Sequence, residues 1–282
     1  MNGWTETYRG GVAPWECDVA EHFTIAYYFD RLADASATLA ETLRLAELAR
    51  ASVRRFDVRF VRELRAGDSF HIDSGPIALD EHSIRFGHRF IDSASGDTVA
   101  WAEETLDGPE AALASEARKA VGQRLVNWPG PAIERRPEPR RFDGFRPGAR
   151  DRVKPTDLDH LGCFTTAAFV HRFTAACLQT LAAIGASQTY MQVERRGYST
   201  FELTLQISGY PRLGNQILVE SGILHLGNSS IRLLHRMSDP ATGAEFARLG
   251  QFGVQLDLDA RRPTALPEAV RAAAAQLLIS LA

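Results

Sequence analysis

The chain has 282 residues, 45% hydrophobic and 24% charged, which is enough apolar material for one large core or two ordinary ones and excludes a disordered protein. A formal net charge of −3 excludes a broadly basic nucleic-acid-binding protein, and three cysteines without paired spacing argue against a disulfide framework or a zinc site. No basic, apolar leader and no apolar run of roughly 18 residues is present. These features predict a cytoplasmic protein without a membrane span or a nucleic-acid partner.

Two segments of the chain repeat one another. Residues 16–35 (ECDVAEHFTIAYYFDRLADA) and 157–176 (DLDHLGCFTTAAFVHRFTAA) are identical at six of twenty positions, at an offset of 159 − 18 = 141. Further along, SIRFGHR at 83–89 recurs as SIRLLHR at 230–236, at an offset of 230 − 83 = 147. The second copy is therefore longer between these two repeated segments, where a loop can accommodate extra residues at little entropic cost. The register therefore predicts two copies of one fold.

Each copy is expected to begin with a short extended segment, residues 6–14 or 149–155, followed by an acidic motif and one long helix. Apolar residues at helical spacing after the motif indicate the helix. Thr24 and Thr165 stand where its N-cap would be, and a threonine hydroxyl there can accept an otherwise unpaired backbone N–H.

Period-two alternation replaces the helical pattern after each helix. It predicts four antiparallel strands per copy, at 53–61, 68–78, 82–92 and 98–106 and at 200–208, 215–226, 229–237 and 245–256. One strand, one long helix and four further strands predict an α+β fold in which a curved, five-stranded antiparallel sheet wraps the helix. A helix buried in this way explains how Tyr27, Tyr28 and Phe29 can be contiguous.

A segment rich in proline and arginine, residues 128–147, separates the two copies. Its prolines disfavour a helix or a central strand, so it is predicted to be an extended linker. We expect an N-terminal domain at 1–127 and a C-terminal domain at 148–282, each ending in a short amphipathic helix, near 115–125 and 267–278.

The order of elements, with an Asp-x-x-x-His at the start of the first helix, resembles the hotdog fold. The motif itself resembles that of acyl-CoA thioesterases related to 4-hydroxybenzoyl-CoA thioesterase, which is roughly acid-x-Asp-x-x-Gly-His followed by small polar residues and a Tyr. Here it reads ECDVAEHFTIAY at 16–27 and DLDHLGCFTTAA at 157–168. The resemblance covers both halves and implies a tandem double hotdog.

The two copies depart from the family pattern at different places. The first has Glu21 instead of Gly and keeps His22, whereas the second keeps Gly162 and has Cys163 instead of the His. These departures imply that the copies have diverged.

Thioester cleavage needs a base or nucleophile near the acyl carbon and donors directed at the oxyanion. A carboxylate just before a helix is near exposed backbone N–H groups. The resemblance assigns the carboxylate to Asp18 and to Asp159, with neither a metal nor an organic cofactor. Whether it attacks directly or activates water stays open. The expected oxyanion donors lie at the helix starts, around Thr24 and Ile25 and around Thr165 and Thr166.

Each candidate has a structural alternative. In it, Asp18 caps the helix and contributes roughly 1 kcal/mol of stability. His22 either contacts or orients the substrate or is a satisfied packing histidine, and Tyr27 either lines an acyl tunnel or belongs to the core. We interpret Cys163 as a small buried residue rather than a nucleophile, because no basic partner is visible.

Other charged residues recur in both copies. Glu16 and Asp157 are expected to be solvated or to support the site from outside. The arginines of SIRxxHR can bind CoA phosphates, but we favour the solvated outer face of a sheet. These arginines are Arg85, Arg89, Arg232 and Arg236.

The leading functional prediction is hydrolysis of an acyl-CoA or acyl-carrier-protein thioester to the free acid and thiol. One alternative is an enoyl-CoA hydratase or dehydratase of the same fold, whose motif resembles Asp-x-Asn-Pro-x-His. The spacing here is one residue shorter and Asn-Pro is absent. Another is a non-catalytic acyl-binding double hotdog. Fusion supplies covalently the dimer of folds that hotdog proteins generally use, and the double unit can associate further into a homo-oligomer.

Overall fold

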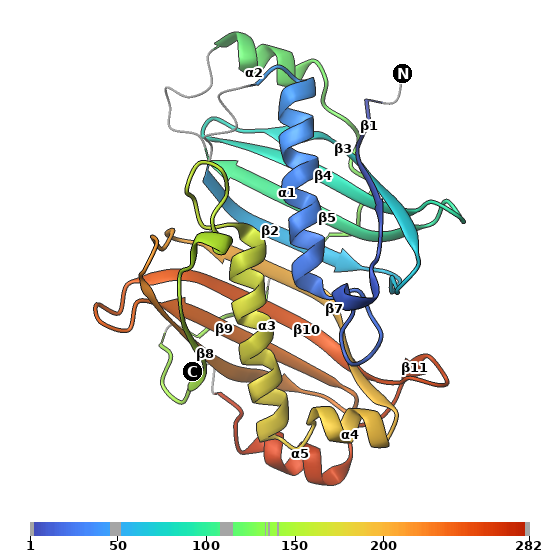
Figure 1. The fold of residues 1–282 in the computed structure, drawn as a ribbon, viewed down its shortest axis with the longest axis vertical. Coiled ribbons are helices and arrows are strands. Elements are labelled where there is room, and N and C mark those ends of the chain that lie inside the picture. The colour runs from blue at the N-terminus through green and yellow to red at the C-terminus, as the bar shows by residue number, and fades with distance from the viewer. Residues whose placement is uncertain are drawn as a thin grey trace. The chain divides into compact units, whose positions relative to one another are not determined.

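The computed structural model describes residues 3–45, 52–107, 115–132, 134, 136–139 and 141–279. Residue contacts divide the chain into two compact units (Figure 1). Unit 1 comprises Met1–Cys17 and His22–Ile133, and unit 2 comprises Asp18–Glu21 and Glu134–Ala282. Each unit contains one long helix and a five-stranded antiparallel arrangement, as the internal repeat predicts.

In unit 1 the strands pair in the order β1-β3-β4-β5-β2, and every pair is antiparallel. A 3-10 turn, η1, precedes the long helix α1, which contacts β1, β3 and β4, and a short helix α2 follows β5. The bounds are β1 Thr5–Gly11, η1 Pro14–Glu16, α1 Ile25–Thr42, β2 Ser52–Phe60, β3 Ser69–Leu79, β4 Ser83–Asp92, β5 Thr98–Asp107 and α2 Ser115–Gly122.

Unit 2 repeats this order as β6-β8-β9-β10-β7, with a short β11 added to β10. The long helix α3 contacts β6, β8 and β9. The bounds are β6 Arg146–Arg152, η3 Pro155–Asp157, α3 Thr166–Ala183, α4 Gln188–Val193, β7 Arg196–Ile207, β8 Gln216–Leu226, β9 Ser230–Ser238, β10 Glu245–Asp257, β11 Arg262–Pro263 and α5 Glu268–Ala275. Helix α4 was not predicted, because six residues are too few to establish a helical period.

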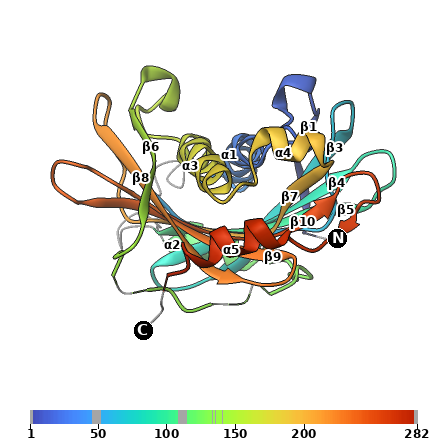
Figure 2. The same cartoon turned by 90° about the horizontal axis from the view of Figure 1, so that it is seen from below.

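Each long helix lies across one face of the sheet of its own unit (Figure 2). Along α1, buried side chains recur at helical spacing, among them Phe29, Leu32 and Leu39. The facing strands alternate: β5 buries Ala100, Ala102 and the side chains that follow at every second position. The helical and the period-two patterns of unit 1 therefore meet in one buried layer, which is mostly apolar.

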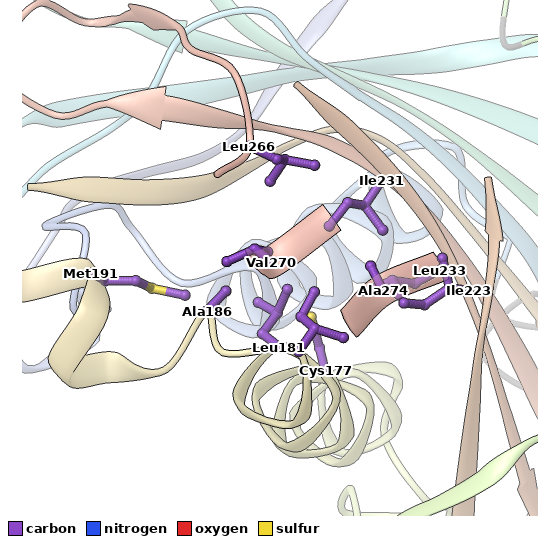
Figure 3. Close-up of a cluster of buried hydrophobic side chains, with 11 residues drawn as sticks. Cys177, Leu181, Ala186, Met191, Ile223, Ile231, Leu233, Leu266, Val270 and Ala274 are labelled. Carbon is purple, nitrogen blue, oxygen red and sulfur yellow. The ribbon is translucent and has the colours of Figure 1, made fainter. Parts of the chain in front are cut away.

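An apolar cluster of unit 2 joins α3, α4 and α5 to strands β8 and β9 (Figure 3). Val270 and Ala274 of α5 are buried in it, which confirms that this helix is amphipathic. Val19, from the Asp18–Glu21 segment of unit 2, packs against the same cluster. The buried members are Cys177, Leu181, Ile184, Ala186, Met191, Ile223, Ile231, Leu233, Leu266, Val270 and Ala274.

Both units also bury a serine–histidine pair at equivalent places on neighbouring strands. In unit 1 the Oγ of Ser74 lies 2.8 Å from Nδ1 of His88, and in unit 2 the Oγ of Ser221 lies 2.7 Å from Nδ1 of His235. All four side chains are almost completely excluded from solvent. The repeated histidine of SIRxxHR is therefore a core residue in both copies. Of the four arginines of the motif, only Arg232 is buried, which corrects for it the expectation of a solvated face.

Burial lowers the pKa of His235 to about 4 and makes unit 2 sensitive to acid. An unfolded histidine titrates near pH 6.5, so below that pH the unfolded chain binds a proton that the folded chain takes up only near pH 4. We expect this one group to lower the free energy of unfolding by about 3 kcal/mol as the pH falls from above 6.5 to below 4.

Urea unfolding of wild type and His235→Gln at pH 6.5 and 4.5 measures this term. The loss of unfolding free energy between the two pH values should be smaller in the variant by about 2 kcal/mol. The exposed His160 provides the control, since His160→Gln should keep the wild-type pH dependence. Equal pH dependence in all three proteins would contradict the assignment.

Candidate functional site

The acidic motif of each copy forms the loop between a 3-10 turn and the long helix. We call residues 17–24 the first loop and residues 158–165 the second loop. Each is closed by a single antiparallel bridge at its two ends, Cys17 with Phe23 and Leu158 with Phe164. The two motifs therefore fold alike and place their aspartates just before the start of the helix.

Asp18 and Asp159 are exposed, and each shapes its own loop through one carboxylate oxygen. The Oδ1 of Asp18 accepts the N–H of Ala20 at 2.8 Å. The Oδ1 of Asp159 accepts the N–H groups of Leu161 at 2.8 Å and Cys163 at 2.9 Å. These are local turns of the kind that aspartate favours, so both aspartates have a structural role in addition to any chemical one.

The backbone conformation after the aspartate explains the glycine of the family pattern. Gly162 has φ 77°, and Glu21 at the same place in the first loop has φ 64°. This left-handed conformation is unfavourable for a residue with a Cβ and costs glycine nothing. The first loop therefore keeps the left-handed backbone conformation of the family glycine, but with a strained residue at that position.

Glu21→Gly is expected to raise the free energy of unfolding by about 0.5–1 kcal/mol, because the relief of left-handed strain exceeds the added chain entropy of glycine. The Glu21 carboxylate lies 4.0 Å from Arg261 and is largely exposed, so its loss should matter little. Urea unfolding compares Glu21→Gly with Glu21→Ala, which retains the strain. An equal gain in both variants would show that removing the carboxylate, not the strain, is responsible.

His22 is buried, and its Nε2 lies 3.0 Å from Oε1 of Glu63, in the segment after β2. The backbone reinforces this pair, since the N–H of Phe23 donates to the carbonyl of Leu64 at 2.7 Å. A carboxylate acceptor keeps the proton on Nε2 and makes Nδ1 the basic nitrogen. The sequence motif identified His22, but Glu63, 41 positions away (63 − 22 = 41), was missed.

The second loop lacks this pair. At the offsets of the repeat, Cys163 replaces His22 and Tyr210 replaces Glu63, and the ring of Tyr210 lies against Phe169. Cys163 is exposed, so the prediction that it is buried was wrong: the loop turns it toward solvent. Partial desolvation and the negative charge of Asp159 raise the pKa of its thiol, which disfavours the thiolate that a nucleophile requires.

Some of the backbone N–H groups at the helix starts already donate hydrogen bonds within the chain, and these cannot serve as oxyanion donors. The N–H of Thr24 donates to the carbonyl of Glu16 at 2.8 Å, and the N–H of Thr165 donates to that of Asp157 at 2.9 Å. These amides are therefore occupied within the chain. Of the predicted oxyanion donors, only the first residue of each long helix remains a candidate, because its N–H group has no acceptor within the helix. They are Ile25 and Thr166.

The two N-cap threonines behave differently. The hydroxyl of Thr165 accepts the N–H of Ala168 at 3.1 Å, which confirms the predicted cap. Thr24 is the N-cap of α1, as predicted, but its side chain makes no capping bond, so only the role expected of its hydroxyl was wrong. The start of α1 is instead determined by backbone bonds, including that of Thr24 to Glu16.

Glu16 and Asp157 are buried and form ion pairs, which corrects the expectation that they are solvated. Glu16 binds Arg31, and Asp157 binds Arg172 through two hydrogen bonds of 2.8 and 2.6 Å. Although burial of Asp157 opposes its charge, hydrogen bonds from Arg172 and from the N–H of Lys154 hold its pKa below the ordinary value. The pairs fasten each helix to the 3-10 turn before it, which explains why both members recur in the repeat.

The aromatic residues of α1 separate into core and partly exposed ones. Tyr28 and Phe29 are buried, and burial raises the pKa of Tyr28. Tyr27 is partly buried and its ring stacks on that of Phe23, with 6.1 Å between centroids. Tyr27 is thus the one of the three that keeps exposed surface beside the first loop.

The arginines of SIRxxHR are held within their own units. Arg85 and Arg89 pair with carboxylates at 3.4 and 2.8 Å, and Arg236 pairs with two carboxylates. Arg232 donates to the carbonyl of Pro137 at 2.9 Å, and burial lowers its pKa. These contacts support a structural role on the sheet rather than phosphate binding.

Metal and membrane features can be stated only for the described part of the chain. There, no group of three or more His, Cys, Asp or Glu residues is placed to hold a metal ion. Within the same residues, no helix has the length and apolar character needed to cross a membrane.

The chain matches the family model of the thioesterase-like superfamily twice, at residues 12–107 and 153–274. No curated protein sequence matches it. An acyl-ACP thioesterase from Bacteroides thetaiotaomicron superposes with a TM-score of 0.69 at 12% identity, covering 89% of this chain and 98% of that one. The 12:0-ACP thioesterase from Umbellularia californica gives 0.68 at 12% identity, covering 91% and 93%. At such identities these structures establish the shared fold, whereas the family match spans most of the chain. The chain therefore belongs to the thioesterase-like superfamily and is a thioester hydrolase built from two hotdog repeats.

Proposed function

We propose that the protein hydrolyses an acyl thioester at the first loop, using the carboxylate of Asp18 and the imidazole of His22. The observation that carries this proposal is the contact of 3.0 Å between buried His22 and Glu63. It belongs to the first copy, because the second has Cys163 and Tyr210 at the two positions. A buried histidine oriented by a carboxylate is a common form of acid–base catalyst.

In the proposed step, Asp18 takes a proton from water while the water oxygen bonds to the acyl carbon. The thioester C–S bond then breaks, and the proton returns to the leaving thiolate, so that water and thioester yield acid and thiol. Glu63 holds the ring of His22 and stabilises the imidazolium when His22 shares this proton. The N–H of Ile25 stabilises the oxyanion at the positive end of α1.

We assign the second loop a structural role. Asp159 accepts two backbone N–H groups of its own loop, and the thiol of Cys163 has a raised pKa. Thr24, the last residue of the first loop, and Tyr27, on the first turn of α1, would contact the acyl group, whereas Thr165 and Thr166 would not.

The proposed substrate is an acyl group on a pantetheine thiol, carried by CoA or by a carrier protein. Both structural neighbours described above are acyl-ACP thioesterases by name. The two carriers present the same thioester. The proposed acid–base step needs neither a metal nor an organic cofactor with either of them.

Thiol release from acyl-CoAs, from acetyl-CoA to palmitoyl-CoA and including benzoyl-CoA, tests the activity. A parallel series of acyl carrier proteins tests the carrier. Loss of enoyl absorbance without thiol release would instead identify a hydratase, and neither signal would identify a binding protein. Single turnover in ¹⁸O water tests the step: label in the released acid alone supports water activation, and label in Asp18 supports direct attack.

A further inference from the structure

We propose that a polar cluster in unit 1, buried except for the partly exposed Ser36, holds helix α1 in the register that the first loop needs for catalysis. The cluster consists of Thr7, Ser36, Ser74, His88 and Glu104, and none of them belongs to the site described above. This inference rests on the proposed function, because α1 carries the candidate oxyanion donor at its first residue. The five are positioning residues, and none is expected to touch the substrate.

The cluster is a continuous chain of hydrogen bonds across the core of unit 1. Ser36 on α1 donates to Oε2 of Glu104 on β5, and that oxygen lies 3.3 Å from Nε2 of His88 on β4. Nδ1 of His88 lies 2.8 Å from Ser74 on β3, whose hydroxyl lies 2.7 Å from that of Thr7 on β1. The helix is thus tied to β5 and, through it, to three further strands.

The cluster is costly to bury, so it requires a reason other than stability. Ser74 and His88 have no exposed surface, and Glu104 is only 2% exposed. Replacing buried charged groups by apolar ones often leaves stability unchanged or raises it. Apolar packing has no preferred direction, whereas hydrogen bonds do, and buried polar groups are best known for specifying register.

Unit 2 shows that the fold itself does not need the carboxyl group of this cluster. At the offsets of the repeat, Cys177 stands for Ser36 and Gln251 for Glu104, while the serine–histidine pair is kept. Burial raises the pKa of the Cys177 thiol to about 12, so this version has a neutral thiol and an amide where unit 1 has a hydroxyl and a carboxyl group. The cluster with the carboxyl group therefore occurs in the same copy as the His22–Glu63 pair and is absent from the copy that lacks it.

Ser36 lies eleven residues after Ile25 (36 − 25 = 11), or about 16 Å along the helix axis. A rigid helix transmits a shift at Ser36 to the amide of Ile25. Misplacement of a catalytic group by about 1 Å can lower a rate about a hundredfold. The tie from Ser36 to Glu104 is therefore positioned to determine where the oxyanion donor stands.

The double variant Ser36→Cys/Glu104→Gln tests the proposal, because it gives unit 1 the residues with which unit 2 already folds. The matched control is Cys177→Ser/Gln251→Glu, the reverse exchange in unit 2. Thiol release from the best acyl-CoA of the panel gives kcat and KM. Hydrogen exchange of peptides from α1 and α3 gives helix mobility, and thermal unfolding reports stability.

We expect the unit 1 variant to lose at least about tenfold in kcat with KM within about threefold. Exchange in residues 25–42 should be at least about fivefold faster while 166–183 is unchanged. The control should keep the wild-type kcat. An unchanged kcat in the unit 1 variant, or a loss that accompanies a collapse in melting temperature, would overturn the positioning role.

If wild type releases no thiol, the proposed function fails, and hydrogen exchange still decides whether the cluster holds α1. Unchanged exchange in residues 25–42 then overturns the inference by itself. Ser36→Ala serves as a second variant, since it removes the tie without altering Glu104. It should show the same faster exchange in α1.

Discussion

Asp18→Asn is expected to lower kcat/KM by about a thousandfold with little change in stability, because the amide retains the hydrogen bond to Ala20 but cannot accept a proton. The matched variant Asp159→Asn removes the equivalent carboxylate from the second loop. It should retain kcat/KM within about threefold of wild type. Thiol release measures both, on the acyl-CoA that wild type hydrolyses fastest.

Glu63→Gln extends this test to the pair that distinguishes the first copy. The amide can keep His22 in place but does not stabilise its protonated form, so kcat should fall about tenfold with KM nearly unchanged. A thousandfold loss in Asp159→Asn with full activity in Asp18→Asn would move the site to the second loop. Equal small losses in both would show that the two aspartates only shape their loops.

Asp157→Asn is expected to lower the free energy of unfolding by about 3–5 kcal/mol, the largest stability effect we anticipate. Asp157 and Arg172 are both less than a tenth exposed, and the variant leaves a buried guanidinium without its main counter-charge. Asp151, 3.2 Å from Arg172, compensates only in part. Urea unfolding at neutral pH provides the measurement.

Adding Arg172→Met to Asp157→Asn should recover at least about 1 kcal/mol, since it removes the unpaired charge as well. The exposed pair of Arg9 and Glu6 provides the control, and Arg9→Gln should leave the unfolding midpoint unchanged. If the double variant is less stable than Asp157→Asn, the loss comes from packing of the Arg172 side chain, including its contact with Phe164.

The elements and the candidate site were predictable to different degrees. Both long helices begin directly after the predicted N-caps, Thr24 and Thr165. All eight strands expected after them were found within a few residues of their predicted bounds, β7 differing most because it begins at Arg196. The helical and the alternating patterns were readable because they depend on neighbours in the chain. Asp18 and His22 were predictable from one short motif. Glu63 was not, because a single carboxylate in a turn has no pattern of its own. The burial of Glu16 and the exposure of Cys163 were also missed, because the burial of a single loop residue depends on the path of the chain around it.

The sequence by itself determined the duplication, the α+β order of elements and the resemblance to thioesterases, since these reside in local periodicity and in a self-comparison of the chain. Only the tertiary structure decided that Glu63 meets His22 and that Glu104 joins Ser36 to His88. It also decided that the N–H of Thr24 donates to the carbonyl of Glu16, which leaves the N–H of Ile25 as the candidate oxyanion donor. Such contacts join residues far apart in the sequence, and their distances depend on the path of the whole chain rather than on any local preference.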